Sequence, residues 1–308
     1  MTSTSIASIG VAAVKASRPK QWVKNGLLFA ALIFAGKLGD VSLWILVCTG
    51  FVAFSALASC GYLLNDLLDM KADRLHPKKS KRPLASGALP VWAGVIEMLV
   101  LLGVGVAAAA SVSPFFLGVA LVYLVTTLSY SLYFKHRVIV DVLVLSLCYV
   151  WRAIAGAVAI DVPVSSWLFL CTAFLALFIG FNKRKAELAH QGASGATRRN
   201  LTQYSEALLD QYQATVTGAA VVCYALYTVS GAATPWMVLT MPFVLYGLFR
   251  FIYLVERKGM GEAPDETFIQ DFPLIMAVLL YLVVVVVILQ LHQMDAFPIL
   301  GAGHQDAP

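Results

Sequence analysis

Residues 65–87 read NDLLDMKADRLHPKKSKRPLASG, a stretch that sets acidic and amide side chains directly before a dense run of bases. Asp66, Asp69 and Asp73 are spaced i, i+3 and i+7, so a helix here would project all three carboxylates from one face. Such carboxylates repel one another unless a cation lies between them, and one or two carboxylates plus substrate phosphates are the usual shell of Mg²⁺. We therefore predict a Mg²⁺ site formed by Asn65, Asp66, Asp69 and Asp73, with the three aspartates as catalytic residues. The bases that follow would suit the phosphates that the metal holds.

The rest of the chain is mostly apolar. Of its 308 residues 60% are hydrophobic and 13% charged, and the mean hydropathy is +0.80, which excludes an ordinary soluble protein. The first ten residues are polar and uncharged, so no cleavable signal peptide is evident. The five cysteines fall inside apolar runs without a C-x-x-C pair and are expected to be small core residues. The net charge of +5 reflects membrane orientation, because the bases gather in alternate connections, and no nucleic-acid partner is expected.

Apolar runs of roughly 17 to 25 residues predict an all-α polytopic membrane protein with nine transmembrane helices. The expected spans are about 22–36, 41–64, 91–111, 114–134, 138–159, 164–182, 213–231, 235–255 and 272–292. Bases precede the first span and follow each even-numbered span, which places the N-terminus in the cytoplasm. Residues 15–292 would form one catalytic domain between an N-terminal tail, 1–14, and a C-terminal tail, 293–308.

One pair of charges is expected within the span 138–159. Asp141 lies near its start, and Arg152 follows three helical turns later on the same face. Arg152 would then lie about 16 Å deeper in the bilayer. An arginine at that depth should face the protein interior and a partner. A structural pair with a neighbouring helix and a role in binding an anionic headgroup are both open.

Four charged clusters are expected to meet on one side of the membrane, at 18–25, 65–87, 130–141 and 182–187. Loops that only orient the protein would explain the bases but not the acids, because Asp and Glu contribute little to orientation. Salt bridges to Lys71 and Arg74 are the alternative to metal or substrate binding for the three aspartates. Trp22 is expected to be an interfacial anchor.

The first acidic motif resembles that of the UbiA superfamily of intramembrane prenyltransferases. Asn65-Asp66-x-x-Asp69-x-x-x-Asp73 is similar to the family's NDxxDxxxD motif, which ends an even-numbered helix. Lys135 and Asp141 are similar to the lysine and aspartate that the family carries between its fourth and fifth helices. The resemblance implies a nine-helix bundle whose acidic motif binds Mg²⁺-diphosphate.

The second acidic motif of that family is replaced here. The corresponding residues, 182–187, read NKRKAE and are basic. Such a stretch suits bare phosphate and not a second metal. Together with RPKQWVKN at 18–25 and YVWRAIAG at 149–156, it resembles the branch of the superfamily that uses decaprenyl phosphate as acceptor. That branch implies transfer of 5-phosphoribosyl from 5-phosphoribosyl-1-diphosphate to a polyprenyl phosphate, with release of diphosphate, for cell-envelope arabinan-type precursors. The enzyme would lie in a bacterial inner membrane with its active site on the cytoplasmic side.

The candidate substrate-binding residues share a polar or charged side chain at the expected cytoplasmic face, or in one case deeper: Lys24, Asn65, Arg74, Lys81, Arg82, Tyr130, Lys135, Arg137, Asp141, Arg152, Lys183, Arg184 and Glu187. His76 could carry a proton or be a solvated loop residue. Two rival functions are a prenyltransferase that takes prenyl diphosphate as donor, and a lipid or anion transporter. The first rival predicts acids at 183–187, and the second predicts charges distributed through the bilayer depth. The surrounding lipids are expected partners, and homo-oligomerisation is open.

Overall fold

The computed structural model describes residues 6–75, 79–194, 201–261 and 264–294, and these contain helices and no strands. The amino-terminal half comprises α1 (Ile6–Ala16), the 3-10 helix η1 (Pro19–Phe29), α2 (Ala30–Phe34), α3 (Val41–Leu75), η2 (Lys79–Lys81), α4 (Pro83–Ser86), α5 (Val91–Val112), α6 (Pro114–Leu132), η3 (Phe134–His136) and α7 (Val140–Ala159). The carboxy-terminal half comprises α8 (Ser166–Ser194), η4 (Leu201–Gln203), α9 (Glu206–Leu226), the π-helical turn η5 (Tyr227–Gly231), η6 (Pro235–Thr240), α10 (Met241–Lys258), α11 (Pro264–Gln270) and α12 (Phe272–Gln293).

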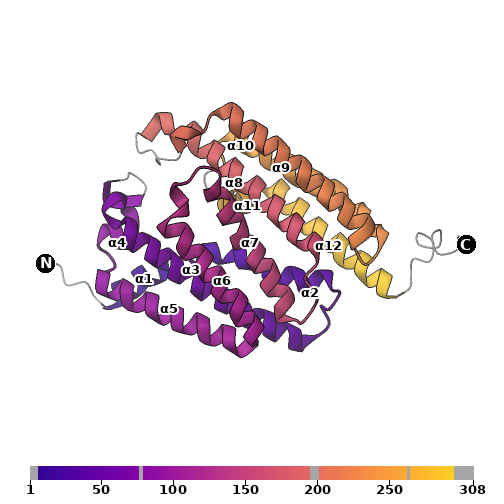
Figure 1. Cartoon of the computed structure of the whole chain (residues 1–308), viewed down its shortest axis with the longest axis horizontal. Coiled ribbons are helices and arrows are strands. Elements are labelled where there is room, and N and C mark those ends of the chain that lie inside the picture. The colour runs from indigo at the N-terminus through magenta and orange to yellow at the C-terminus, as the bar shows by residue number, and fades with distance from the viewer. Residues whose placement is uncertain (1–5, 76–78, 195–200, 262–263, 295–308) are drawn as a thin grey trace, which may run out of the picture.

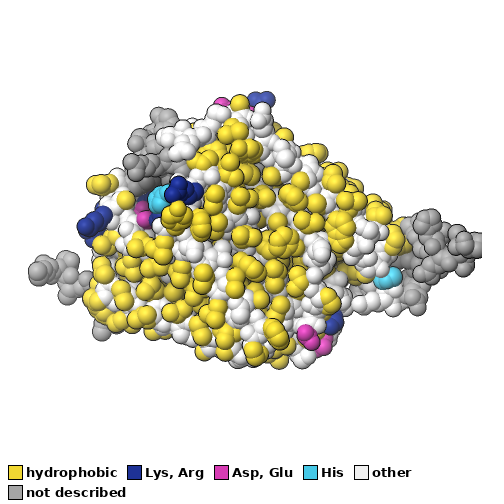
Figure 2. All heavy atoms as spheres, in the orientation of Figure 1, with side chains coloured by type: hydrophobic (Ala, Val, Ile, Leu, Met, Phe, Trp, Pro, Cys, Tyr) yellow, Lys and Arg dark blue, Asp and Glu magenta, His cyan; other side chains and the backbone are white. Residues whose placement is uncertain are grey.

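The long helices form one bundle in which sequence neighbours pack side by side. α3 packs against α5 and α6, α6 against α7, α7 against α8, and α8 against α9 (Figure 1). Helices α7 and α8 thus join the two halves of the chain. Figure 2 shows that hydrophobic side chains cover most of the visible face, while charged side chains gather at its margins. This distribution is typical of a protein whose middle is surrounded by lipid.

Eight segments of the described chain are long and apolar enough to cross a membrane, and they begin at Val41, Val91, Pro114, Val140, Ser166, Glu206, Pro235 and Phe272. They correspond to eight of the nine predicted spans, so the all-α membrane class is confirmed. Helix starts also agree with the chemistry of the sequence. The Ser113 side chain caps α6, which begins at Pro114, and accepts a hydrogen bond from the backbone N–H of Phe116 at 3.0 Å.

The first predicted span, 22–36, has a different form. It contains most of η1 and the short helix α2 in place of one continuous α-helix. Polar side chains of η1 point into the bundle: Asn25 donates to Ser55 Oγ at 3.0 Å and Trp22 Nε1 donates to Ser59 Oγ at 3.0 Å. Trp22 therefore binds α3, and its role as an interfacial anchor stays a prediction. These hydrogen bonds to α3 accompany a 3-10 helix where the apolar composition predicts an α-helix.

The predicted N-terminal tail, 1–14, contains structure. From Ile6 the chain forms α1, and Ala12 and Ala16 of this helix pack on Leu63, Leu84 and Leu89. The small alanine side chains allow this close packing, which places the carboxy-terminal end of α1 beside the carboxy-terminal part of α3. Most of the predicted C-terminal tail, from residue 295, lies outside the described residues.

The backbone of η1 lies directly against α7. Leu28 is fully buried, and a side-chain carbon built on Gly156 would overlap the carbonyl group of Leu28. Only glycine lets the two backbones approach this closely.

We expect Gly156→Ala to destabilise the protein by about 1 to 3 kcal/mol, since the added methyl group forces η1 away from α7. Gly103→Ala is the matched control, because nothing lies within 4 Å of its added carbon. Alanine favours helix over glycine, so this control should unfold at the same or a higher temperature. Thermal unfolding in detergent measures both, and equal melting temperatures would contradict the close contact.

Candidate active site

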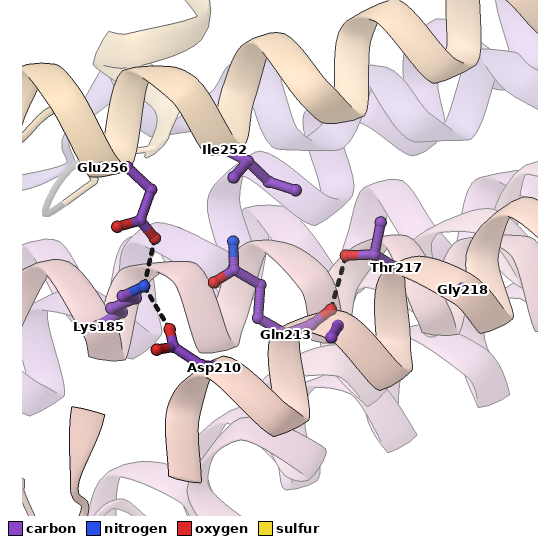
Figure 3. A pocket seen from close by; sticks show the side chains of 8 residues that line it. Lys185, Asp210, Gln213, Thr217, Gly218, Ile252 and Glu256 are labelled. Carbon is purple, nitrogen blue, oxygen red and sulfur yellow. Dashed lines mark hydrogen bonds and ion pairs between the residues drawn. The ribbon is translucent and has the colours of Figure 1, made fainter. Parts of the chain in front are cut away.

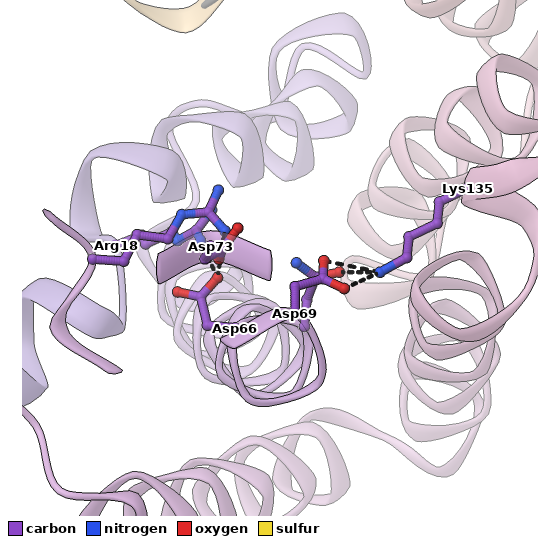
Figure 4. A network of polar contacts seen from close by, with 7 residues as sticks. Arg18, Asp66, Asp69, Asp73 and Lys135 are labelled. Atoms are coloured by element: carbon purple, nitrogen blue, oxygen red, sulfur yellow. Dashed lines mark hydrogen bonds and ion pairs between the residues drawn. The ribbon is translucent and has the colours of Figure 1, made fainter. Parts of the chain in front are cut away.

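The acidic motif lies at the last turns of α3, where its carboxylates divide between two sides of the helix (Figure 4). On one side Asp66 and Asp73, seven residues apart, share one guanidinium. Arg82 Nη1 lies 3.0 Å from Asp66 Oδ1 and 2.6 Å from Asp73 Oδ2. Arg18 Nη2 donates to the same Asp66 oxygen at 2.5 Å. Asp66 is 2% exposed, so two arginines compensate a carboxylate that is closed off from water.

Arg18 is held in place by the polypeptide around it. The residue adopts a left-handed conformation with φ 53° between α1 and η1. The preceding Ser17 donates through its hydroxyl to Glu97 Oε1 at 2.6 Å and accepts through its carbonyl from Ser59 Oγ at 2.8 Å. The guanidinium also lies over the Tyr62 ring, 5.1 Å from its centroid. A non-glycine residue with positive φ is strained, and these contacts maintain it.

On the other side of α3, Asp69 and Asn65 face Lys135 of η3. Lys135 Nζ lies 2.7 and 2.9 Å from the two carboxylate oxygens of Asp69 and 3.3 Å from Asn65 Oδ1. Lys135 is 7% exposed, whereas the Asp69 side chain is 35% exposed. Three oxygens thus converge on one ammonium group at a place that water and ligands reach.

The four residues predicted as one metal site contact two separate groups of cations, and the metal site itself stays a prediction. Asp69 is displaced around the helix from Asp66 and Asp73, and cations from other elements separate them. No three His, Cys, Asp or Glu side chains of the described chain converge as metal ligands. The donor chemistry nevertheless fits a hard divalent cation, since Asn65 and Asp69 aim oxygens at one point and phosphate oxygens complete such a shell. The alternative, salt bridges to Lys71 and Arg74, is not found among the described residues, where the three aspartates pair with Arg18, Arg82 and Lys135.

The basic stretch 182–187 is compensated by acids. Arg184 is 1% exposed and contacts Asp141 of α7 and Glu187 of its own helix. Its Nε lies 2.9 Å from Asp141 Oδ2, close enough for an ion pair, although the N–H is not aligned for a hydrogen bond. Asp141 is fully buried and also accepts from the Tyr204 hydroxyl at 3.3 Å. Burial raises the pKa of Tyr204 to about 12. The Arg184–Asp141 pair joins α7 to α8, and Glu187 pairs with Arg184 within α8. That these three residues bind substrate stays a prediction.

The next residue, Lys185, points to the other side of α8 and lies between Asp210 of α9 and Glu256 of α10 (Figure 3). This ion triad closes one end of a groove of ≈ 310 Å³ that is also lined by Gln213 and Thr217. Gln213 Nε2 donates to the buried Asn182 Oδ1 at 3.0 Å. Arg184 and Lys185 thus both join helices, while Lys183 is half-buried. The basic phosphate site expected at 182–187 stays a prediction.

Arg152 is 4% exposed, and its described hydrogen bonds all go to neutral groups. It donates to Asn25 Oδ1 at 2.7 Å, to the Cys148 carbonyl at 2.7 Å and to the Tyr123 hydroxyl at 2.9 Å. The Tyr123 and Tyr149 rings lie 4.8 and 5.4 Å from its guanidinium carbon. These contacts fix η1 against α6 and α7, so the structural interpretation is favoured over headgroup binding.

The other predicted residues lie around these clusters. Lys24 is half-buried and donates to Gln21 Oε1 at 2.5 Å. Arg74 donates to the Ala85 carbonyl at 3.2 Å, and Arg137 donates to the Tyr133 hydroxyl at 2.9 Å; both are exposed. Lys81 is exposed beside Arg82, and Tyr130 is half-buried. His76 lies outside the described residues.

Four charged residues of these networks were not predicted as site residues: Arg18, Lys185, Asp210 and Glu256. Arg18 is the first residue of the RPKQWVKN motif, so this motif could have indicated it as a site residue. Asp210, near the start of α9, and Glu256, near the end of α10, belong to no recognisable motif.

The chain is similar to known proteins along nearly its whole length. Residues 26–272 match the model of the UbiA prenyltransferase family. A decaprenyl-phosphate phosphoribosyltransferase of Mycobacterium tuberculosis is 37% identical over 86% of this chain and 90% of its own. One from Corynebacterium glutamicum is 36% identical over 84% of this chain and 80% of its own. The solved structure of a UbiA homolog from Archaeoglobus fulgidus bound to GPP and Mg2+ superimposes with a TM-score of 0.71 and 18% identity, over 91% of this chain and 99% of that one.

We expect Arg184→Met to lower the free energy of unfolding by about 3 to 5 kcal/mol, because it leaves the buried Asp141 carboxylate without its guanidinium. The double variant Asp141→Asn, Arg184→Met should recover part of this loss, since the orphaned charge is gone. Arg137→Met, which removes an exposed arginine, is the control and should change little. Thermal unfolding in detergent measures the stability of all these variants. An Arg184→Met variant as stable as the parent protein would contradict the pairing of Arg184 with Asp141.

Proposed function

Because the chain belongs to the UbiA prenyltransferase family, we propose that it is a membrane enzyme that transfers 5-phosphoribosyl from 5-phosphoribosyl-1-diphosphate to a polyprenyl phosphate and releases diphosphate. The observation that carries the proposal is the similarity to decaprenyl-phosphate phosphoribosyltransferases over 84–86% of the chain. The product would supply a pentose for cell-envelope arabinan-type precursors.

The chemistry of this transfer suits the site. The acceptor oxygen already belongs to a phosphate anion, so no general base is required, and the main tasks are to position two anionic substrates and to stabilise the departing diphosphate. Positive charge grows on the ribose ring as the C1–O bond breaks, as in other glycosyl transfers. Lysine and arginine side chains that can exchange a carboxylate partner for a phosphate would position the substrates and stabilise the diphosphate. Carboxylates beside the ribose would stabilise the positive charge that develops on its ring.

We assign the diphosphate to the side of α3 where Asn65, Asp69 and Lys135 meet. Lys135 Nζ is a buried ammonium whose carboxylate partner is partly exposed, so an incoming diphosphate can share it. Lys24, Arg137 and Lys183 are the remaining candidates for phosphate contacts, since each is half-buried or exposed. Asp66 and Asp73 keep Arg18 and Arg82 in place on the opposite side.

Mg²⁺ is the cation that we propose for Asn65 and Asp69, with Asp66 and Asp73 as nearby acids. When bound it would neutralise the diphosphate and make it a better leaving group. The oxygen donors and the shortage of protein ligands both fit a metal that takes part of its shell from substrate phosphate.

The membrane orientation completes the proposal. We place the ends of α3 and α8 and the 3-10 helix η3 in the cytoplasm of a bacterial inner membrane, because the bases gather there. Residues 19–34 would form the ninth crossing. At about 2.0 Å per residue the 11 residues of η1 span roughly 22 Å, and the 5 of α2 add about 7 Å, together near the thickness of a hydrocarbon core. Its interior position, with Asn25 and Leu28 fully buried, suits such a backbone.

We expect purified protein to move label from 5-phosphoribosyl-1-diphosphate into a polyprenyl phosphate in a metal-dependent way. Asp69→Ala and Asp66→Ala should each lower turnover at least about 100-fold while the protein stays folded, since one removes a cation ligand and the other releases two arginines. Chelation should abolish transfer and added Mg²⁺ should restore it. Extraction of labelled lipid into the organic phase measures turnover.

The same assay separates the rivals. Label transferred from a prenyl diphosphate to a small acceptor, with none from the phosphoribosyl donor, would overturn the proposal. Movement of lipid across sealed vesicles without a covalent change would favour a transporter. Near-normal activity in a folded Asp69→Ala variant would refute the metal assignment.

A further inference from the structure

A basic pocket of ≈ 250 Å³ lies on the Asp66 side of α3, away from Lys135. Its lining residues come from four elements or their ends: Lys15, Arg18, Asp66, Lys81, Arg82 and Pro83. We propose that this pocket binds the 5-phosphate of the phosphoribosyl donor, and so selects a donor with a phosphate at each end. The inference rests on the proposed function and adds a second, separate anion site to it.

The charge of the pocket matches a phosphomonoester. Four cations line it, and two of them, Arg18 and Arg82, bind the carboxylates Asp66 and Asp73, so the cations exceed these acids by two positive charges. A phosphomonoester carries about −1.5 to −2 at pH 7, so one such group would balance the pocket. Asp66 does not repel it strongly, because Arg18 and Arg82 already bind that carboxylate.

The two arginines are set in advance for a further oxyanion. Each guanidinium carries five N–H donors in a fixed fork, so binding to a carboxylate leaves capacity for a phosphate. Arg18 is fixed by its stacking on Tyr62 and by the contacts of Ser17, and Arg82 immediately precedes α4, which begins at Pro83. Both side chains are about a quarter exposed, at 27% and 26%, so a soluble ligand can reach them.

The position of the pocket explains why two phosphate sites would be useful. Asp66 and Asp69 lie three residues apart on α3, and their carboxylates point in different directions, toward Arg18 and toward Lys135 (Figure 4). A donor that places its diphosphate at Lys135 and its 5-phosphate in the pocket would lay its ribose across the end of α3. A prenyl diphosphate has phosphate at one end only and would leave the pocket without a ligand.

The experiment measures binding to the purified full chain by calorimetry, without metal, with ribose 5-phosphate and inorganic diphosphate as separate probes. Lys15→Gln and Lys81→Gln should each weaken ribose 5-phosphate about fivefold and leave diphosphate unchanged, since each removes one charge from the pocket. Lys81→Arg should retain binding. Lys20→Gln removes an equally exposed charge outside the pocket and should have no effect.

Lys135→Gln should give the reverse pattern, with weaker diphosphate and unchanged ribose 5-phosphate. Farnesyl phosphate is a third probe, because the lipid acceptor also ends in a phosphomonoester. The proposal is overturned if the parent protein does not bind ribose 5-phosphate, if neither lysine variant weakens it, if diphosphate weakens equally, or if only farnesyl phosphate responds. A parent protein that binds ribose 5-phosphate as expected but transfers no label would refute the proposed function and not the pocket.

Discussion

Charged side chains at the membrane boundary or deeper in the bilayer must be paired within the protein. This requirement determines how the helices are joined. Removing one partner of a buried ion pair costs several kcal/mol, so such a pair holds its two elements together. Arg184 joins α7 to α8 through Asp141, and Lys185 joins α8 to α9 and α10 through Asp210 and Glu256. Arg152, deeper in the bundle, is met by the Asn25 amide and the Tyr123 hydroxyl, and thereby fixes η1. Where no ion pair is formed, hydrogen bonds and aromatic faces take its place.

The same requirement shapes the site at the end of α3. Arg18 and Lys135 reach the aspartates from elements far away in the sequence, and Arg82 reaches them from the loop that follows α3. The acidic motif is therefore the point at which the ends of α1 and α4 meet η3. Each contact there is also one that a phosphate can share, because arginine and lysine have more donors than one carboxylate uses. The groups that stabilise the fold and the groups proposed to bind substrate are therefore partly identical. The clusters differ in access: Asp69 and the two arginines are partly exposed, while Arg184 and Asp141 are closed.

Local pattern predicted most of the fold. Apolar length located eight of the spans, and Pro114 marked a helix start, because both signals act over a single helix. The irregular form of residues 22–36 was not predicted, since it depends on where Asn25 and Trp22 find partners on α3. The small residues of α1 gave no sign of their packing on Leu63 and Leu84. Such contacts join segments tens of residues apart and have no local signature.

The sequence by itself determined the membrane class, the helical order, the resemblance to the UbiA superfamily and the presence of an acidic motif followed by bases. These follow from composition and from spacing along one helix, which tertiary contacts do not alter. Only the tertiary structure decided which cation meets which acid. Helical spacing predicted one metal cluster from Asn65, Asp66, Asp69 and Asp73, and the structure adds that Arg18 and Arg82 contact Asp66 while Lys135 contacts Asp69. Likewise, the sequence of residues 182–187 predicted an open basic surface, whereas in the structure α7, α9 and α10 contribute acids that pair with Arg184 and Lys185. The charge that a ligand meets depends on all the helices packed around it.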